Sequence, residues 1–164
     1  LLETGIHTFV SQVMLHKFYP QAIELIKRIK MQGDEVLVIS ATVAFLVKPI
    51  AALLEINNVL AIDLIMDENE MPTSTIKGHV SYREGKVLRL KEWLAEQGRE
   101  FENSHFYSDS INDLSLLEYV DFPIVTNPDA KLAEIANQKA WPILDWRRDD
   151  ALSTAILRAE NNAN

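Results

Sequence analysis

The sequence predicts an α/β domain built around a parallel sheet. Short apolar runs, which are typical of buried parallel strands, alternate along the chain with segments that have the periodicity of amphipathic helices. At 164 residues, with 48% hydrophobic and 24% charged residues, the chain is long enough for one ordinary domain with its own core. We therefore expect one domain rather than two.

The first predicted unit is a helix followed by a buried strand and a second helix. Within residues 20–33, apolar side chains recur at the i, i+3, i+4, i+7 spacing, and a glycine stands where this helix would end. Residues 35–40 form a nearly continuous apolar run, which predicts a buried strand. Thr42 is suited to cap the next helix, over 42–54, and Pro49 marks either the true start of that helix or a kink.

The rest of the chain repeats this alternation. Residues 59–66 predict a strand, the polar stretch 67–78 predicts a turn-rich excursion, and residues 86–97 predict a helix that Gly98 ends. The remaining predicted elements are strands over 105–107 and 122–125, helices over 111–119 and 130–138, and an edge strand over 141–144.

Polar side chains follow three of the predicted strands. They are found in the segments 40–42, 108–113 and 126–129. In open α/β sheets, ligands bind outside the carboxyl ends of the strands. We therefore expect these hydroxyl, amide and carboxylate groups to converge on one edge of the sheet.

The densest of these segments runs from Asp109 to Asp113 and holds two carboxylates and the amide of Asn112. Oxygen ligands of this kind suit Mg²⁺, but aspartate and serine are also common helix caps, so both interpretations stay open from the residues alone. Ser40 is suited either to bind phosphate or to cap a helix. Lys86 stands at a helix start, where a cation is unfavourable unless a carboxylate or phosphate pairs with it.

In this order, the segments Val38–Thr42, Gly85–Lys86 and Tyr107–Leu114 resemble motifs two, three and four of the haloacid dehalogenase-like phosphatases. The resemblance is strongest to the phosphoserine-phosphatase-like branch with a helical cap, subfamily IB, and it spans Phe9 to Trp146. It implies a three-layer Rossmann-like core with a parallel sheet. It also implies a Mg²⁺-dependent phosphomonoester hydrolase, in which an aspartate attacks phosphorus and forms an aspartyl-phosphate that water hydrolyses.

The resemblance also implies roles for individual residues. Those implied to act in catalysis are Ser40, Lys86 and Asp113. Those implied to bind the phosphoryl group are Ser40, Ala41, Thr42, Lys86 and Asn112. Those implied to hold the Mg²⁺ ion are Asp109 and Asp113. The implied partner is a small phosphorylated metabolite, and both phosphoserine and histidinol phosphate remain open as substrates.

One motif of the family is missing. No Asp-x-Asp occurs anywhere in the 164 residues, although the family carries its nucleophile in that motif, on the strand between those that bear motifs two and four. We expect the chain to be the C-terminal part of a longer protein and, by itself, unable to form the phosphoenzyme. Residues 1–18 would then be a remnant of the helical cap and its return linker, 19–146 the core, and 147–164 a C-terminal helix or tail.

Without that first strand, two buried strands would face each other with unpaired backbone groups. A rearrangement that closes the gap, or a strand from a partner, is the alternative. Two other functions also remain open: a non-catalytic relative that keeps the phosphate and metal pocket, and an unrelated α/β binding domain whose carboxylates are only caps.

The composition excludes several other classes. The formal net charge is −8 and the adjacent basic pairs are confined to Lys27–Arg28 and Arg147–Arg148, so we expect neither nucleic-acid nor membrane binding. The absence of cysteine excludes thiolate chemistry and is compatible with the cytoplasmic location that we expect. No glycine-rich nucleotide-binding loop and no Gly-x-Ser-x-Gly motif is present, and the oligomeric state cannot be read from the sequence.

Overall fold

The computed structural model of the protein describes residues 18–69, 71–98 and 100–147, and it has the α/β class that the sequence predicts. In these ranges the helices are α2 (Pro20–Met31), α3 (Ala44–Leu53), α4 (Glu84–Gln97), α5 (Leu114–Tyr119) and α6 (Ala130–Gln138), with a 3₁₀ turn, η3 (Ile111–Asp113). The strands are β1 (Leu37–Val43), β2 (Asn58–Met66), β3 (Pro72–Lys77), β4 (His105–Ser108), β5 (Phe122–Thr126) and β6 (Ile143–Leu144). None of the helices among these residues has the length and apolar character needed to cross a membrane.

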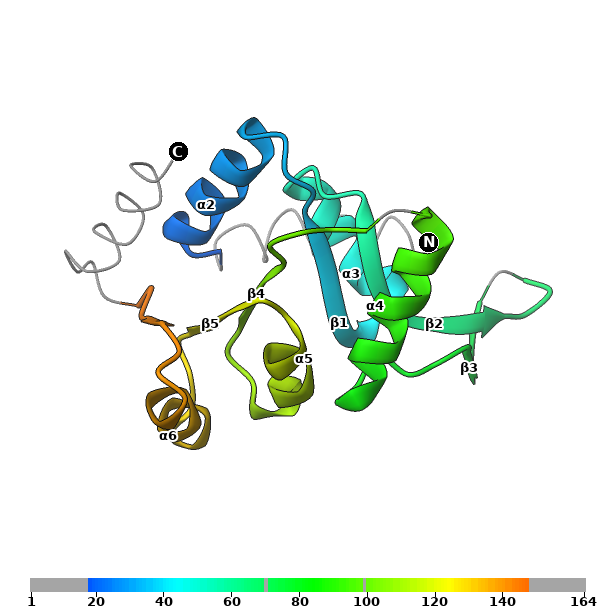
Figure 1. The fold of residues 1–164 in the computed structure, drawn as a ribbon. Coiled ribbons are helices and arrows are strands. Elements are labelled where there is room, and N and C mark those ends of the chain that lie inside the picture. The colour runs from blue at the N-terminus through cyan, green and yellow to red at the C-terminus, as the bar shows by residue number, and fades with distance from the viewer. Residues whose placement is uncertain (1–17, 70, 99, 148–164) are drawn as a thin grey trace.

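The strands form two sheets of three strands each, rather than one continuous sheet (Figure 1). In the first sheet β1 pairs in parallel with β2, and β2 pairs antiparallel with β3. In the second sheet β4, β5 and β6 are all parallel. Within the described residues, β1 and β4 each have one neighbouring strand and do not pair with each other. The separation between these two strands that we expected from the missing first strand is therefore present.

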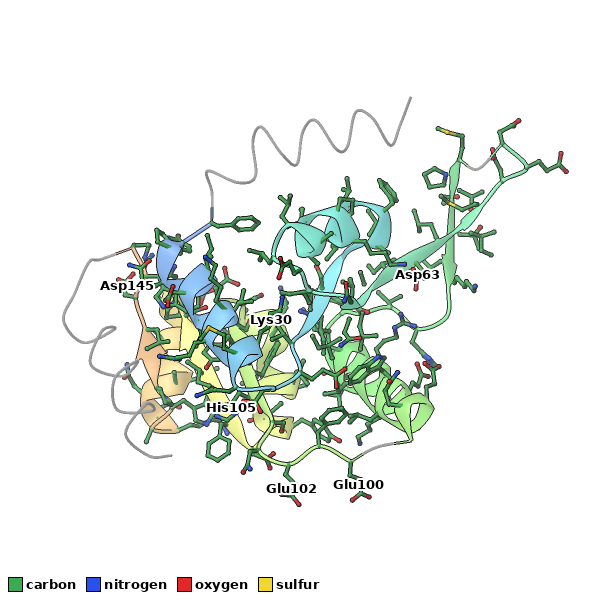
Figure 2. The ribbon with its side chains drawn as sticks, turned by 90° about the horizontal axis from the view of Figure 1, so that it is seen from above. Lys30, Asp63, Glu100, Glu102, His105 and Asp145 are labelled. Carbon is green, nitrogen blue, oxygen red and sulfur yellow. The ribbon has the colours of Figure 1, made fainter. Side chains whose placement is uncertain are left out.

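Helices α3 and α4 cover opposite faces of the β1–β2 pair, which gives the three layers of a Rossmann-like core (Figure 2). Ala44 and Val47 of α3 pack on Ala61 of β2, and this cluster is extended by two partly buried valines of the strands. Lys30 of α2 donates to the backbone oxygen of Glu55 at 2.9 Å, so α2 is joined to the end of α3. Apolar burial thus joins α3 to the β1–β2 pair.

The second core lies under α5, β5 and α6. Four fully buried residues form its centre, and they are Leu117, Val125, Leu132 and Ala136. Helix α6 has the bounds that the sequence predicts, because Asp129 caps it: Asp129 Oδ1 accepts the Leu132 N–H at 2.8 Å.

The segment 67–78, which we expected to be a turn-rich excursion, contains strand β3 and forms an arm with β2 that projects from the molecule (Figures 1 and 2). Asp67 Oδ1 closes the turn by accepting the N–H groups of Asn69 and Met71. Thr73 Oγ1 then donates to the Ile65 backbone oxygen at 2.7 Å. The sequence did not predict this strand because it starts at a proline. Proline is found mainly in edge strands and at the first residue of a strand.

Four other expectations are corrected. Strand β1 continues through Val43, so Thr42 lies within a strand and does not cap α3, and Pro49 lies inside α3 rather than at its start. The helix predicted over 111–119 is divided into η3 and α5. The edge strand predicted over 141–144 is reduced to Ile143–Leu144. Apart from residues 18 and 147, the assignments for 1–18 and 147–164 fall outside the described residues.

We predict that Leu132→Ala destabilises the fold by roughly 2 to 5 kcal/mol, because Leu132 is 0% exposed and its loss leaves a cavity among α5, β5 and α6. Urea unfolding followed by circular dichroism measures this change. Met31→Ala is the matched control, since Met31 is 86% exposed and should change stability by less than about 0.5 kcal/mol. Equal effects of the two substitutions would contradict the assigned core.

Candidate functional site

A buried ion pair joins the start of α4 to the segment that follows β4. Lys86 Nζ lies 2.6 Å from Asp113 Oδ1, and the two side chains are 7% and 10% exposed. The other carboxylate oxygen, Asp113 Oδ2, accepts the Ser108 hydroxyl at 2.7 Å. A buried charge is tolerated when it is both paired and hydrogen-bonded, and here each oxygen of the carboxylate has a partner.

The same lysine also reaches the first sheet. Lys86 Nζ donates to the backbone oxygen of Ile39, in β1, at 3.4 Å. Asp113 follows β4 of the second sheet, so one ammonium group contacts elements of both sheets. The predicted site residues Lys86 and Asp113 are therefore brought together between β1 and the segment that follows the carboxyl end of β4, and α/β proteins bind ligands at the carboxyl ends of their strands.

A tight loop places Lys86. The Tyr82 N–H donates to the Val80 backbone oxygen at 2.8 Å, and Arg83 adopts a positive φ of 50°. A Cβ atom added at Gly85 would lie 2.0 Å from the Val80 oxygen. Only glycine allows this close approach, so the glycine of the predicted Gly85–Lys86 motif has a steric reason.

The segment after β4 supplies its own helix cap. Ser110 is the N-cap residue of η3, and its hydroxyl accepts the Asn112 N–H at 3.2 Å. Neither carboxylate of the segment makes a side-chain capping bond: Asp113 is paired with Lys86, and Asp109 is exposed. The hypothesis that these two carboxylates serve only as helix caps is therefore wrong.

The remaining predicted phosphate ligands lie in β1. Ser40 follows Ile39, the residue that Lys86 contacts, and its hydroxyl accepts the Thr42 N–H at 3.1 Å. Ala41 and Thr42 are exposed. In this structure these three residues lie within the strand rather than after it, because β1 runs on to Val43.

The carboxylates fit a Mg²⁺ ion unequally. In the part of the chain that the structure describes, no group of three or more histidine, cysteine, aspartate or glutamate residues is arranged to hold a metal. Mg²⁺ needs only one or two carboxylates because it keeps several water ligands. Asp109 is exposed and has no hydrogen bond or ion pair to another described residue, so it fits the role of a direct ligand. Asp113 already has both oxygens engaged, by Lys86 and Ser108.

Sequence reasoning missed Tyr82. Its hydroxyl donates to Asn112 Oδ1 at 3.2 Å across 30 residues of sequence. No sequence signal points to this contact, because a tyrosine in a polar loop has no periodicity or motif of its own. Ser108 belongs to the predicted polar segment 108–113, but the sequence predicts no role for it. Its hydrogen bond to Asp113 forms because the segment folds back on itself.

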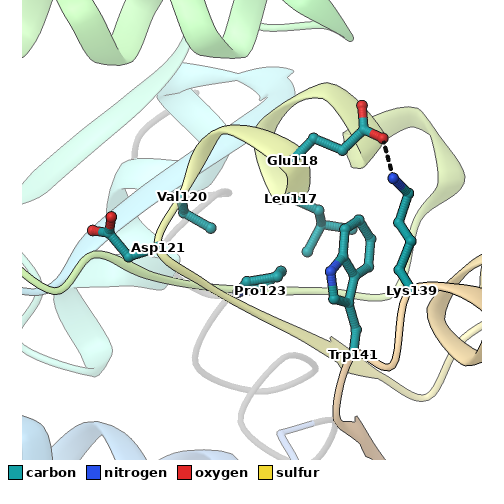
Figure 3. A pocket seen from close by; sticks show the side chains of 7 residues that line it. All are labelled: Leu117, Glu118, Val120, Asp121, Pro123, Lys139 and Trp141. Carbon is teal, nitrogen blue, oxygen red and sulfur yellow. Dashed lines mark ion pairs between the residues drawn. The ribbon is translucent and has the colours of Figure 1, made fainter.

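A separate hollow of about 440 Å³ lies away from this site (Figure 3). The residues that line it are Leu117, Glu118, Val120, Asp121, Pro123, Lys139 and Trp141. It is next to the amino ends of β5 and β6, whereas the ion pair lies at the carboxyl end of the parallel neighbour β4. Hydrogen bonds from the hydroxyl and N–H of Ser104 lower the pKa of Asp121. Lys139 is paired with Glu118 at 2.8 Å, so the charges here are already satisfied.

Comparison with known proteins identifies the family. The model of the haloacid dehalogenase-like hydrolases matches residues 2–118. The chain belongs to this family. A histidinol-phosphatase of Neisseria meningitidis is 37% identical over 142 residues, which are 85% of this chain and 64% of that protein.

Solved structures share the fold of this chain. A Bordetella pertussis protein of unknown function has 35% sequence identity and a TM-score of 0.84, and the match covers 88% of this chain and 66% of that one. A substrate-bound phosphoserine phosphatase, at 24% identity and a TM-score of 0.59, shares the fold over 75% of this chain and 56% of its own. The chain thus spans slightly less than two thirds of the Neisseria and Bordetella relatives.

We predict that Lys86→Met destabilises the full-length protein by about 3 to 5 kcal/mol, because it leaves the Asp113 carboxylate buried without its partner. The double variant Lys86→Met/Asp113→Leu should regain much of this stability, since the unpaired charge is then gone. Chemical unfolding measures both. Lys139→Met is the control, because its pair with Glu118 is exposed and should contribute no more than about 1 kcal/mol. A double variant as unstable as the single one would argue against the buried pair.

We also predict that Gly85→Ala lowers stability by roughly 1 to 3 kcal/mol, because the new methyl group would collide with the Val80 oxygen. A Gly→Ala substitution in a helix usually raises stability, since alanine is favoured over glycine there by about 1 kcal/mol. Ala95→Gly, at an exposed position of the same helix, is the comparison and should lower stability through helix propensity alone. The thermal midpoints of the two variants test the prediction, and a stabilised Gly85→Ala protein would contradict the close approach.

Proposed function

We propose that this chain is part of a Mg²⁺-dependent phosphomonoester hydrolase that acts on a small phosphorylated metabolite. The observation that carries the proposal is the buried Lys86–Asp113 pair, which joins Ile39 of β1 to the segment after β4. Membership of a hydrolase family supports the proposal, as does a relative named histidinol-phosphatase. The absence of cysteine, which suits a reducing compartment, supports a cytoplasmic location.

In this proposal, Lys86 neutralises the charge of the phosphoryl group. Asp113 and the Ile39 oxygen fix its ammonium group in place, so that it does not have to be reoriented when the phosphoryl group binds. Ser40 and Asn112 donate hydrogen bonds to the phosphoryl oxygens, and the exposed residues Ala41 and Thr42 complete the phosphate-binding segment. Phosphoryl transfer depends mainly on this kind of positioning and charge neutralisation.

Asp109 would hold the Mg²⁺ ion, with Asp113 supporting the site through Lys86 and Ser108. The bound ion would supply positive charge to the phosphoryl oxygens. An exposed carboxylate beside a buried ion pair is suited to this division of roles, because Asp109 is open to a hydrated Mg²⁺ ion while Asp113 is held by Lys86 and Ser108.

The proposed reaction needs a nucleophilic carboxylate to form the aspartyl-phosphate. Since the 164 residues contain no Asp-x-Asp, that carboxylate has to come from outside them. The edges that β1 and β4 leave without a described partner are the places where an additional parallel strand would pair. We propose that residues 1–164 alone bind the phosphoryl group and do not hydrolyse the phosphate ester.

A non-catalytic role is the second candidate, and the missing Asp-x-Asp is the observation that favours it. Such a protein would use the same Lys86, Asn112 and Asp109 groups to bind phosphate or Mg²⁺. The two candidates differ in turnover by the full-length natural protein: a hydrolase releases phosphate from p-nitrophenyl phosphate, and a binding protein does not.

We predict that Asp109→Asn in the full-length protein abolishes Mg²⁺-dependent hydrolysis of p-nitrophenyl phosphate, because the amide is a much weaker ligand for the ion than the carboxylate. The thermal midpoint should not change, since Asp109 is exposed. Steady-state rates at increasing Mg²⁺ concentration measure the effect. Asp34→Asn, in the exposed loop before β1, is the matched control and should keep full activity. Full activity of Asp109→Asn would overturn the metal assignment.

A further inference from the structure

Two contacts tie the loop before α4 to the segment after β4. Lys86 pairs with Asp113, and Tyr82, four residues earlier, bonds to Asn112, the residue before Asp113. We infer that Tyr82 is a positioning residue, which holds the carboxamide of Asn112 so that its NH₂ group faces the phosphoryl group. This inference rests on the proposed function, and it assigns a role to a residue outside the three matched motifs.

The chemistry of the carboxamide gives the first argument. Asn112 has one acceptor oxygen and one NH₂ donor group on opposite sides of the same planar unit. The Tyr82 hydroxyl donates to Oδ1 at 3.2 Å, so the oxygen side is fixed against the tyrosine. The NH₂ group then lies on the other side, and it donates to no acceptor among the described residues. A phosphoryl oxygen is an acceptor, and this orientation offers it a donor.

The opposite orientation would be harmful to anion binding. If the carboxamide turned over, its oxygen would face the phosphoryl oxygens, and two acceptors would repel each other. The backbone alone does not prevent this, because the Asn112 N–H is bonded to Ser110 Oγ and fixes only the main chain. In the orientation of this structure the tyrosine hydroxyl donates to Oδ1, so it stabilises the arrangement that leaves the NH₂ group for the phosphoryl oxygens.

The position of Tyr82 is itself fixed by backbone rather than by burial. Tyr82 is 43% exposed, but its N–H donates to the Val80 backbone oxygen and its backbone oxygen accepts the Gly85 N–H at 2.9 Å. The Arg83 guanidinium lies 5.1 Å from the ring centre. Because Tyr82 is an exposed residue, the loss of its hydroxyl should change the stability of the fold little and should affect the site.

The test compares Tyr82→Phe with Tyr119→Phe in the full-length protein. Tyr119 is a matched control because it is also 43% exposed, has a lysine over its ring at 5.0 Å, and lies on α5. The measurements are kcat and KM for p-nitrophenyl phosphate and inhibition by inorganic phosphate. We expect kcat/KM of Tyr82→Phe to fall about tenfold and phosphate inhibition to weaken, with an unchanged thermal midpoint. Tyr119→Phe should match the unaltered protein.

The double variant Tyr82→Phe/Asn112→Ala identifies the route of the effect. If Tyr82 acts through Asn112, removing the hydroxyl has no further effect once the carboxamide is gone, so the double variant equals Asn112→Ala. Two independent losses that multiply would overturn the inference, as would a lowered thermal midpoint of Tyr82→Phe alone.

An active Tyr82→Phe protein beside an impaired Asn112→Ala protein would overturn the inference and leave the proposed function intact. If the unaltered protein neither hydrolyses p-nitrophenyl phosphate nor binds inorganic phosphate, the proposed function fails and the inference fails with it.

Discussion

The buried contact between Lys86 and Asp113 is the interaction on which the rest of the structure depends. It places a positive and a negative charge in a region with little access to water, which is tolerated only because both carboxylate oxygens have partners. Around this pair, Gly85 allows the loop to approach closely, Ser108 satisfies the second oxygen, and Ser110 turns the chain into η3. Each of these residues is explained by the requirement to keep the pair in place.

The pair also connects two halves of the fold that share no hydrogen-bonded strands in the described residues. The first half consists of β1 and β2 between α3 and α4, with the β3 arm, and the second of β4 to β6 with α5 and α6. Lys86 contacts Ile39 within β1 and the segment after β4, and α4 packs on α5. The site therefore lies at the junction of the two halves, beside the carboxyl end of β4, where an α/β protein binds its ligand.

Charge and exposure divide the site into two kinds of residue. Lys86, Asp113 and Ser108 are buried and joined through the Asp113 carboxylate, so they form the fixed floor of the site. Asp109 and Tyr82 are exposed, so they are accessible to a ligand. A fixed floor with accessible residues beside it suits phosphoryl transfer, because the charge of the ligand meets groups that do not have to move. In a chain of net charge −8, such a local arrangement matters more than the overall charge.

The sequence by itself determined the α/β class, nearly all the helices and strands, and the residues of the motifs, because apolar periodicity and short polar motifs are local properties of the chain. It predicted the bounds of α6 and the end of α4 at Gly98. It missed β3, which begins at a proline and exists only by pairing with β2. Only the tertiary structure decided that Lys86 reaches Asp113 and that Tyr82 reaches Asn112, since 27 and 30 residues separate the partners. Contacts over such distances depend on how whole elements pack, which no local pattern encodes.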